Sequence, residues 1–339
     1  MEYTQEASYY TCIENQKVQC ALCPHYCKIN PGQSGKCQVR KNIGGKLFTM
    51  IYGHIVASNL DPIEKKPLYH FFPGKQIFSI GTQGCNFRCN FCQNWHISQN
   101  PPESPETCKI IEPAELFASV LRMKKENIGI AYTYNEPGIG FEYVKDLSVM
   151  AHNANLKNVW VSNGFIAPEP LMDIMDYTDA FNIDLKAFDE SFYQKVTGGK
   201  LEPVKETLIR IVRSKKHLEI TLLLIPTLND DETKFTEMIQ WISQTLGDAI
   251  PLHISRYFPH YQSTIASTSG KLMDRFYEIA VQKLKFVYLG NDNSNSGKNT
   301  KCPSCGNLCI TRDGYQINTR GIDFQGACNQ CHEPIALKK

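Results

Sequence analysis

The chain has 339 residues, of which 42% are apolar and 21% charged, so it is long enough to bury the core of one large domain with small additions. Lysine and arginine total 36 against 34 for aspartate and glutamate, which argues against a general attraction to nucleic acid or to an anionic membrane. The first residues lack the pattern of a signal peptide, and the longest uncharged apolar run, ITLLLIP, is far too short to cross a bilayer, so we expect a cytoplasmic protein with no membrane partner.

Residues 1–75 form an irregular, cysteine-rich region. Its motif CALCPHYCKINPGQSGKC places Cys20, Cys23, Cys27 and Cys37 at a C-x2-C-x3-C-x9-C spacing. Such short spacings suit metal ligation better than disulfides, which belong mainly to small secreted domains. Four thiolates make a closed ligand set, so we predict a second metal site that holds either structural zinc or an electron-carrying iron–sulfur cluster. The spacing does not choose between them.

From residue 76 to residue 290 the chain alternates short apolar runs with helical patterns, the first of which starts at Pro113. Nearly continuous apolar runs are typical of parallel strands that are covered on both faces. A strand-then-helix unit repeated about every 30 residues predicts an α/β fold, namely a partial or full parallel (β/α) barrel. A doubly wound sheet is the alternative, although no G-x-G-x-x-G motif follows the first strand. The predicted strands span 76–81, 128–133, 158–162, 180–185, 218–225, 251–255 and 285–290.

The stretch GTQGCNFRCNFCQNW follows the first predicted strand and contains Cys85, Cys89 and Cys92. Loops at the carboxyl ends of barrel strands build the reactive face of such folds. A four-iron cluster needs four ligands, so three cysteines would leave one iron open to a small molecule, and Gly84 lets the backbone turn tightly around it. The alternatives are that the three cysteines pack as small apolar side chains, or that Cys108 is a fourth ligand.

The pattern CNFRCNFC, in which Phe91 is the aromatic residue, resembles the signature of the radical S-adenosylmethionine (SAM) superfamily. Together with DPIEKKPLYHFFPG, YTYNEPGIGFEY, NIDLKAF and the closing cysteine tail, it resembles the AmmeMemoRadiSam-system radical SAM enzyme, a family similar to the activating enzymes of pyruvate formate-lyase and other glycyl radical enzymes. The resemblance implies a [4Fe–4S] cluster that reductively cleaves SAM to methionine and a 5′-deoxyadenosyl radical. This radical abstracts hydrogen from a small-molecule or protein substrate that the sequence does not identify. It also implies a reductant such as flavodoxin or ferredoxin.

The segment TYNEP, with Asn135 and Glu136, takes the place of the superfamily's Gly-Gly-Glu-Pro motif. The resemblance implies that Glu136 holds the methionine ammonium of SAM, a role that suits a carboxylate by charge. Here Tyr134 and Asn135 replace the two glycines, so the fine geometry differs. The alternative for Glu136 is a carboxylate that stabilises the start of a helix.

Two further strand ends carry motifs that the resemblance assigns to SAM. Ser162 and Asn163 resemble a Thr-Asn-Gly triplet of the activating enzymes, although Val161 stands where those enzymes have an acidic residue. Asp184 and Lys186 match an Asp-Leu-Lys motif, which implies an acid for the ribose hydroxyls and a lysine for the carboxylate. A surface salt bridge is the alternative for this pair, but the apolar run before it argues against exposure.

Weaker candidates lie farther along the chain. His253 and Arg256 on the sixth predicted strand could contact the carboxylate or the adenine of SAM, and a core histidine is the alternative for His253. Asn229 is a candidate of similar strength. The substrate pocket has no diagnostic motif, but its lining could come from His96, Tyr132, Tyr134, Arg256 and Tyr257.

Residues 291–339 consist of a linker and a cysteine-bearing tail. The linker is rich in Asn, Ser and Gly, and ITRDGYQI in the tail predicts a β-hairpin that turns at Asp313-Gly314. Two C-x2-C pairs flank this hairpin and resemble a zinc ribbon, with a rubredoxin-like iron site as the alternative. The tail lacks a basic face interleaved with aromatic residues, so nucleic acid is not an expected partner. The four tail cysteines are Cys302, Cys305, Cys328 and Cys331.

The leading hypothesis is therefore a radical SAM enzyme with an unidentified substrate. A narrower version is an activase that installs a glycyl radical on a partner enzyme, which depends on analogy between relatives. A rival of another class is an electron-transfer protein whose several iron–sulfur centres only relay electrons. A third, an RNA-binding module with a zinc ribbon, is disfavoured by the near-neutral charge.

Overall fold

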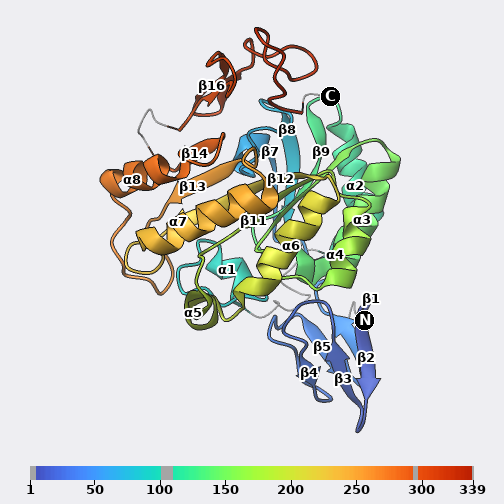
Figure 1. Cartoon of the computed structure of the whole chain (residues 1–339). Coiled ribbons are helices and arrows are strands. Elements are labelled where there is room, and N and C mark those ends of the chain that lie inside the picture. The colour runs from blue at the N-terminus through green and yellow to red at the C-terminus, as the bar shows by residue number, and fades with distance from the viewer. Residues whose placement is uncertain (1–4, 101–109, 293–296, 338–339) are drawn as a thin grey trace.

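The computed structural model describes residues 5–100, 110–292 and 297–337, and an eight-stranded sheet lies at its centre (Figure 1). The strand order is β14-β13-β12-β11-β10-β9-β8-β7, in which β8 to β14 are parallel and the edge strand β7 is antiparallel to β8. The strands are β7 (Ala57–Pro62), β8 (Gln76–Gly81), β9 (Asn127–Tyr132), β10 (Lys157–Ser162), β11 (Ala180–Asp184), β12 (His217–Leu224), β13 (Leu252–Arg256) and β14 (Val287–Gly290).

Helices connect the parallel strands because each has one apolar stripe to bury against the sheet. In α6, Leu201, Val204, Leu208 and Ile211 recur at helical spacing and are all buried. Among the helices of the described residues, none combines the length and apolar character that crossing a bilayer requires. The α-helices are α1 (Trp95–Ser98), α2 (Pro113–Arg122), α3 (Phe141–Asn153), α4 (Pro168–Met175), α5 (Glu190–Phe192), α6 (Leu201–Arg213), α7 (Glu232–Trp241) and α8 (Gly270–Ala280).

Shorter helical turns complete the chain around these elements. They are the 3-10 turns η1 (Ile63–Lys65) and η2 (Pro137–Gly140) and the π-type turns η3 (Tyr193–Thr197) and η4 (Ile242–Leu246). Pro137 begins η2 directly after Glu136, which places the η2 turn beside a predicted site residue.

The predicted α/β fold and all seven predicted parallel strands are confirmed, with ends that shift by at most about two residues, as usual for strand limits. The pairings run from β14 to β7 without closing on themselves, so of the two predicted alternatives the partial barrel is the one observed. The sequence did not predict β7, because its residues ASNLDP are half-exposed at an edge and show no apolar run. Every residue of β7, from Ala57 to Pro62, pairs with a residue of β8. The first strand of the sheet therefore lies before residue 76, the predicted start of the α/β region.

An N-terminal module, residues 5–49, lies at the end of the sheet near α1 (Figure 1). It consists of two small antiparallel sheets, which explains why the sequence showed no helical or long apolar pattern there. The strands are β1 (Gln5–Glu6), β2 (Tyr10–Ile13), β3 (Lys17–Cys20), β4 (Lys28–Ile29), β5 (Arg40–Ile43) and β6 (Lys46–Thr49).

The C-terminal tail packs at the opposite end of the sheet (Figure 1). Its strands are β15 (Thr300–Lys301), β16 (Leu308–Asp313) and β17 (Gln316–Asn318), and the predicted hairpin turn after Asp313 is confirmed. The guanidinium of Arg312 stacks 4.1 Å from the centre of the Tyr69 ring, and Leu337 donates a backbone hydrogen bond to the carbonyl of His70. Residues 293–296 of the predicted linker lie outside the described residues.

Candidate functional site

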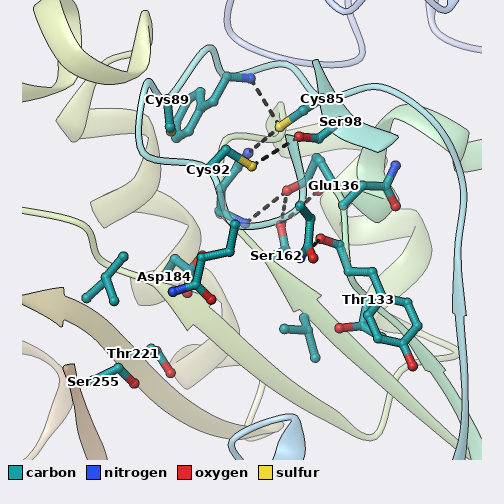
Figure 2. Close-up of a pocket in the computed structure, with 18 of the residues that line it drawn as sticks. Cys85, Cys89, Cys92, Ser98, Thr133, Glu136, Ser162, Asp184, Thr221 and Ser255 are labelled. Atoms are coloured by element: carbon teal, nitrogen blue, oxygen red, sulfur yellow. Dashed lines mark hydrogen bonds between the residues drawn. The ribbon is translucent and has the colours of Figure 1, made fainter. Parts of the chain in front are cut away.

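A cavity of about 580 Å³ lies at the carboxyl ends of the parallel strands (Figure 2). Its walls come from β7 and the residues that follow it, from the loops after β8, β9, β10 and β11, and from the carboxyl-terminal halves of β12 and β13. This is the face where parallel α/β folds place their reactive groups. The cavity brings together ten of the predicted residues, which are Cys85, Cys89, Phe91, Cys92, Asn135, Glu136, Ser162, Asn163, Asp184 and Lys186.

The three clustered cysteines lie on one loop, residues 82–94, which we call the cysteine loop. The backbone N–H of Phe87 donates to the Cys85 Sγ atom over 3.3 Å, and the Cys92 Sγ atom lies 3.1 Å from the Ser98 hydroxyl in α1. The Arg88 N–H donates to the Thr197 carbonyl over 2.7 Å, which ties the loop to the η3 turn. The loop is thus held in a fixed shape with its sulfur atoms at the cavity.

Gly84 and Asn135 determine how the cysteine loop leaves β8. Gly84 has φ +84°, and a Cβ atom there would lie 2.6 Å from Val39 Cγ1 and 3.0 Å from the Cys37 carbonyl oxygen, so only glycine fits. The Asn135 side chain accepts from the Thr82 N–H over 3.1 Å and donates to the Gly84 carbonyl over 2.9 Å. Asn135 therefore positions the loop backbone, a role that the motif comparison did not reveal.

The donor set of this loop fits a [4Fe–4S] cluster with one open iron. Burial raises the pKa of the Cys85 thiol and raises that of Cys89 to about 12, so binding of the cationic iron–sulfur core must displace protons from both thiols. The cysteines that line the cavity are Cys85, Cys89 and Cys92, which is one ligand short of a closed set. Cys108, the alternative fourth ligand, lies outside the described residues.

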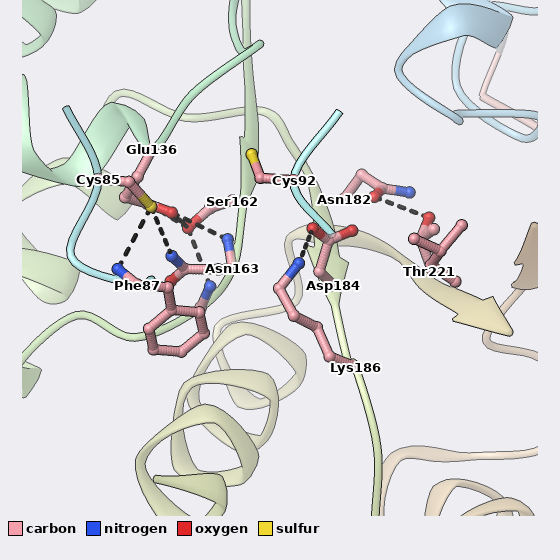
Figure 3. A network of polar contacts seen from close by, with 12 residues as sticks. Cys85, Phe87, Cys92, Glu136, Ser162, Asn163, Asn182, Asp184, Lys186 and Thr221 are labelled. Carbon is pink, nitrogen blue, oxygen red and sulfur yellow. Dashed lines mark hydrogen bonds and ion pairs between the residues drawn. The ribbon is translucent and has the colours of Figure 1, made fainter. Parts of the chain in front are cut away.

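Glu136 is the most deeply held carboxylate of the cavity (Figure 3). Its two oxygens accept hydrogen bonds from the Gly138 N–H (2.8 Å), the Ser162 hydroxyl (2.9 and 3.0 Å) and the Asn163 N–H (2.9 Å). Burial raises the pKa of Glu136 to about 7, although these hydrogen bonds oppose the shift. The carboxyl group is therefore fixed in orientation and poised to change its charge near neutral pH.

The end of β10 connects Glu136 to the cysteine loop. The Asn163 side-chain amide donates to the Asn86 side-chain oxygen over 2.8 Å and lies 3.7 Å from the Cys85 Sγ atom (Figure 3). Asn86 in turn donates to the Phe165 carbonyl over 2.8 Å. Ser162 and Asn163 therefore bridge the carboxylate and the cysteine loop, which accounts for their place in a motif.

Asp184 and Lys186 form an ion pair on the opposite side of the cavity (Figure 3). The Lys186 ammonium lies 2.7 Å from the Asp184 carboxylate. Burial would lower the pKa of Lys186, but Asp184 and then Cys89 outweigh it and raise that pKa. Lys186 thus stays charged beside the cysteine loop, where it can attract a carboxylate.

The structure does not bring His253, Arg256 or Asn229 into the cavity. His253 is the second residue of β13 and so lies toward the far end of the sheet, where its ring nitrogen is 2.6 Å from the buried Glu219 carboxylate. Arg256 turns away and donates to the Thr268 carbonyl over 2.6 Å. The Asn229 amide donates to the carbonyls of Lys186 and Leu223, so it connects the loop after β11 to the end of β12. Their predicted contacts with SAM have no support from these positions.

Of the five residues suggested for the substrate pocket, Tyr134 lines the cavity. The Tyr132 hydroxyl donates to Asn158, and that of Tyr257 to Ser263, so both are buried among other residues. His96 is exposed. Aromatic residues near a barrel mouth pack the core as readily as they line the opening, and the sequence pattern alone did not distinguish the two.

A polar network in the wall of the cavity was missed by the sequence reasoning. Asp61 accepts hydrogen bonds from the Lys66 ammonium (2.7 Å) and the Tyr134 hydroxyl (2.6 Å), and Lys66 also lies 4.8 Å from the centre of the Tyr134 ring. All three line the cavity, although Lys66 is only 2% exposed. The signal was present in DPIEKK, because charges this dense rarely become buried without a partner.

The C-terminal cysteines gather into a compact set. The Sγ atoms of Cys302 and Cys331 lie 3.4 Å apart, those of Cys305 and Cys328 lie 3.6 Å apart, and all four fall within 4.8 Å of one another. Four sulfurs at this spacing could hold one metal ion. The set lies at the end of the sheet opposite the cysteine loop (Figure 1), so a metal there would stabilise the tail and take no part in the cavity.

Comparison with known proteins gives three findings. The profile of the Radical SAM superfamily matches residues 79–239. An uncharacterized protein of Methanocaldococcus jannaschii is 38% identical over 98% of this chain and 99% of its own length, and the pyruvate formate-lyase-activating enzyme of Listeria monocytogenes is 24% identical over 52% of this chain and 75% of its own. A radical SAM methyltransferase from Sphaerobacter thermophilus shares the fold with a TM-score of 0.52 at 14% identity, over 70% of this chain and 71% of its own.

Proposed function

The chain belongs to the radical SAM superfamily, and from this premise we propose how its cavity binds SAM and meets a substrate. The protein is an enzyme of the radical SAM type, for which the substrate is unidentified. The observation that carries the proposal is that three cysteines on one loop share a cavity with a buried carboxylate, Glu136, and with a lysine–aspartate pair. A protein that only relays electrons needs no such polar cavity beside its cluster.

The roles of the residues follow from their chemistry. Cys85, Cys89 and Cys92 would hold a [4Fe–4S] cluster, which when bound supplies the electron that splits SAM into methionine and a hydrogen-abstracting 5′-deoxyadenosyl radical. Glu136 accepts hydrogen bonds from the methionine amino group, because its carboxylate is already fixed by three donors, the Gly138 N–H, the Asn163 N–H and the Ser162 hydroxyl. Lys186 attracts the methionine carboxylate. Asp184 accepts from the ribose hydroxyls.

Similarity to activating enzymes favours a protein substrate and a carrier protein as reductant. Relatives include a pyruvate formate-lyase-activating enzyme and a (2S)-3-sulfopropanediol dehydratase activating enzyme, each only 22–24% identical. We therefore propose flavodoxin or ferredoxin as the electron donor. The broader proposal is hydrogen abstraction from the substrate of an AmmeMemoRadiSam-type system, and the narrower alternative is an activase that installs a glycyl radical on a partner enzyme. The network of Asp61, Lys66 and Tyr134, which lines the same cavity, would contact the substrate. We further propose zinc for the tail site.

The direct test of this function is a product assay. Anaerobically reconstituted protein is mixed with SAM and dithionite, and we expect 5′-deoxyadenosine and methionine in equal amounts by chromatography and mass spectrometry. We also expect SAM to alter the electron paramagnetic resonance spectrum of the reduced cluster, because its amino and carboxylate groups would take the open iron position. If SAM leaves the spectrum of the reduced cluster unchanged and no 5′-deoxyadenosine forms, the proposal is refuted and the electron-transfer alternative is favoured.

Binding of SAM should depend on pH through Glu136. The pKa of this carboxyl group is raised to about 7, so a fall in pH through that value protonates it and removes the acceptor for the SAM amino group. We expect the affinity for SAM to be about tenfold lower at ~pH 6 than at ~pH 8. Isothermal titration with the wild-type protein, measured at a series of pH values, checks this.

The variant Glu136→Gln isolates the contribution of Glu136 from the titration of SAM itself. We expect Glu136→Gln to bind weakly at every pH and to lose most of the pH dependence that the wild type shows. Glu64→Gln is the matched control, because Glu64 is also a buried glutamate whose pKa is raised by burial, but it accepts a hydrogen bond from the Gly74 N–H outside the cavity. Equal pH profiles for wild type and Glu136→Gln would exclude Glu136 as the acceptor.

A further inference from the structure

Four cysteines of the N-terminal module surround a cavity of their own. Cys20 ends β3, Cys23 and Cys27 lie in the loop before β4, and Cys37 lies just before β5. The Cys20 N–H donates to the Cys27 carbonyl over 3.0 Å, which closes the loop and brings the cysteines together. All four line one enclosed cavity, together with Arg40. Four thiols around one space form a closed ligand set, in contrast to the three of the cysteine loop.

The separation of the ligand atoms distinguishes between the two occupants that the sequence spacing left open. Zinc lies about 2.3 Å from each thiolate, which puts the sulfurs ~3.8 Å apart and leaves no space for a water molecule among them. Among the described residues, it is the tail set that gathers its ligand atoms within 4.8 Å. Within the same described residues, the four cysteines of the N-terminal cavity form no set as compact as this, and neither do those of the cysteine loop. The sulfurs of the N-terminal cavity are therefore spread for an occupant larger than a single ion.

Arg40 indicates the charge of the occupant. Its side chain is 1% exposed, and Nη2 donates to the Ser8 carbonyl and to Glu142, each over 2.7 Å. Its Nε and Nη1 atoms are buried without a hydrogen-bond partner, which is costly for a charged group. Arg40 lines the same enclosed cavity as the four cysteines. An anionic cluster would give these donors their missing sulfur acceptors.

The N-terminal cavity adjoins the cysteine loop. The Cys37 carbonyl lies 3.0 Å from the position of a Cβ on Gly84, the residue before Cys85. Ile139 lines the N-terminal cavity and also lies 3.0 Å from that same position. From the other side, the ring of His25 bonds to the Asn86 carbonyl over 2.8 Å. Two redox centres in these places would be separated by a few packed residues without intervening solvent.

We propose that Cys20, Cys23, Cys27 and Cys37 hold a second [4Fe–4S] cluster, which takes single electrons from a reduced carrier protein and passes them to the cluster of the cysteine loop. One electron leaves the flavin or iron–sulfur centre of the carrier, the second cluster is reduced and then reoxidised, and no bond is made or broken. Assignment of the cluster depends on the N-terminal cysteines alone, whereas the relay also depends on the proposed function.

The test removes the cysteine loop's ligands so that its cluster cannot contribute. The triple variant Cys85→Ala, Cys89→Ala and Cys92→Ala is reconstituted anaerobically with iron and sulfide, and its fold is checked by circular dichroism. We expect about four irons and about four acid-labile sulfides per chain, with one zinc in the tail, and a reduced-state paramagnetic signal that SAM does not alter. Absence of 5′-deoxyadenosine from the wild type would refute the proposed function without changing this iron count.

Zinc at about two per chain with no sulfide, or iron without acid-labile sulfide, would overturn the cluster assignment. Should the triple variant fail to fold, the wild-type protein decides the matter, because two clusters require about eight irons and SAM should alter only part of the reduced signal. Reduced flavodoxin is then added to the triple variant. Appearance of the reduced signal supports the relay, and a cluster that dithionite reduces but flavodoxin does not would exclude it.

Discussion

Replacement of Cys89 by alanine is expected to abolish the formation of 5′-deoxyadenosine, to the level of a reaction without protein. Cys89 is the middle cysteine of the loop, is only 6% exposed and faces the cavity near Lys186. Two remaining thiolates cannot hold a cluster that needs three protein ligands and one open iron. The measurements are iron and sulfide content, the spectrum in the presence of SAM, and the product assay.

The matched control is Cys12→Ala. Cys12 is also a cysteine of this chain, but it is exposed on β2 of the N-terminal module and lies outside all three clustered sets. We expect this variant to keep the wild-type iron content, spectrum and product yield. If Cys89→Ala retained a cluster that responds to SAM, then another ligand would complete the site, and Cys108 would be the first residue to examine.

Replacement of Gly84 by alanine is expected to have the second largest effect. Adoption of φ +84° by alanine costs about 1–2 kcal/mol. The added methyl group would also lie 2.6 Å from Val39 and 3.0 Å from both Ile139 and the Cys37 carbonyl, which adds about 1–3 kcal/mol of overpacking. Relief of these contacts must move the cysteine loop away from the N-terminal module. We therefore expect loss of stability by urea unfolding together with loss of bound iron and of product.

Gly32→Ala separates the two components of this effect. Gly32 has nearly the same backbone angle, φ +78°, but a Cβ there meets nothing within 4 Å, and the residue is exposed. The control should show only the conformational cost of about 1–2 kcal/mol and should keep its iron and its activity. Equal behaviour of the two variants would mean that steric contact between the loop and the N-terminal module does not fix the geometry of the site.

Much of the fold could be read from local patterns. The seven parallel strands are apolar runs because both of their faces are buried, and this property is visible in a single sequence. The hairpin after Asp313 was predicted from its Asp-Gly turn. The edge strand β7 was not predicted, because a strand with one pairing partner and an exposed side carries no such run. Its role as a partner of β8 depends on contacts between separate segments.

The reactive face was also predictable in outline. Parallel strands end at one edge of a sheet, so motifs that follow β8, β9, β10 and β11 had to meet there. Cys85, Glu136, Ser162 and Asp184 do so. His253 and Arg256 were predicted from their strand alone, and neither lines this cavity. His253 lies near the start of β13 and contacts Glu219, whereas the Arg256 side chain is directed to the Thr268 carbonyl.

The sequence by itself determined the types of ligand and their grouping, because cysteines only a few residues apart stay close in space in any fold. Only the tertiary structure decided how far apart the sulfurs of each group lie, because that spacing is fixed by the loops that carry them: compact in the tail, wider in the N-terminal module. It also decided that Lys66 and Asp61 meet Tyr134, and that the buried Arg40 lines one cavity with Cys20 and Cys37. These contacts join segments far apart in the chain, and long-range packing, which no local pattern records, brings them together.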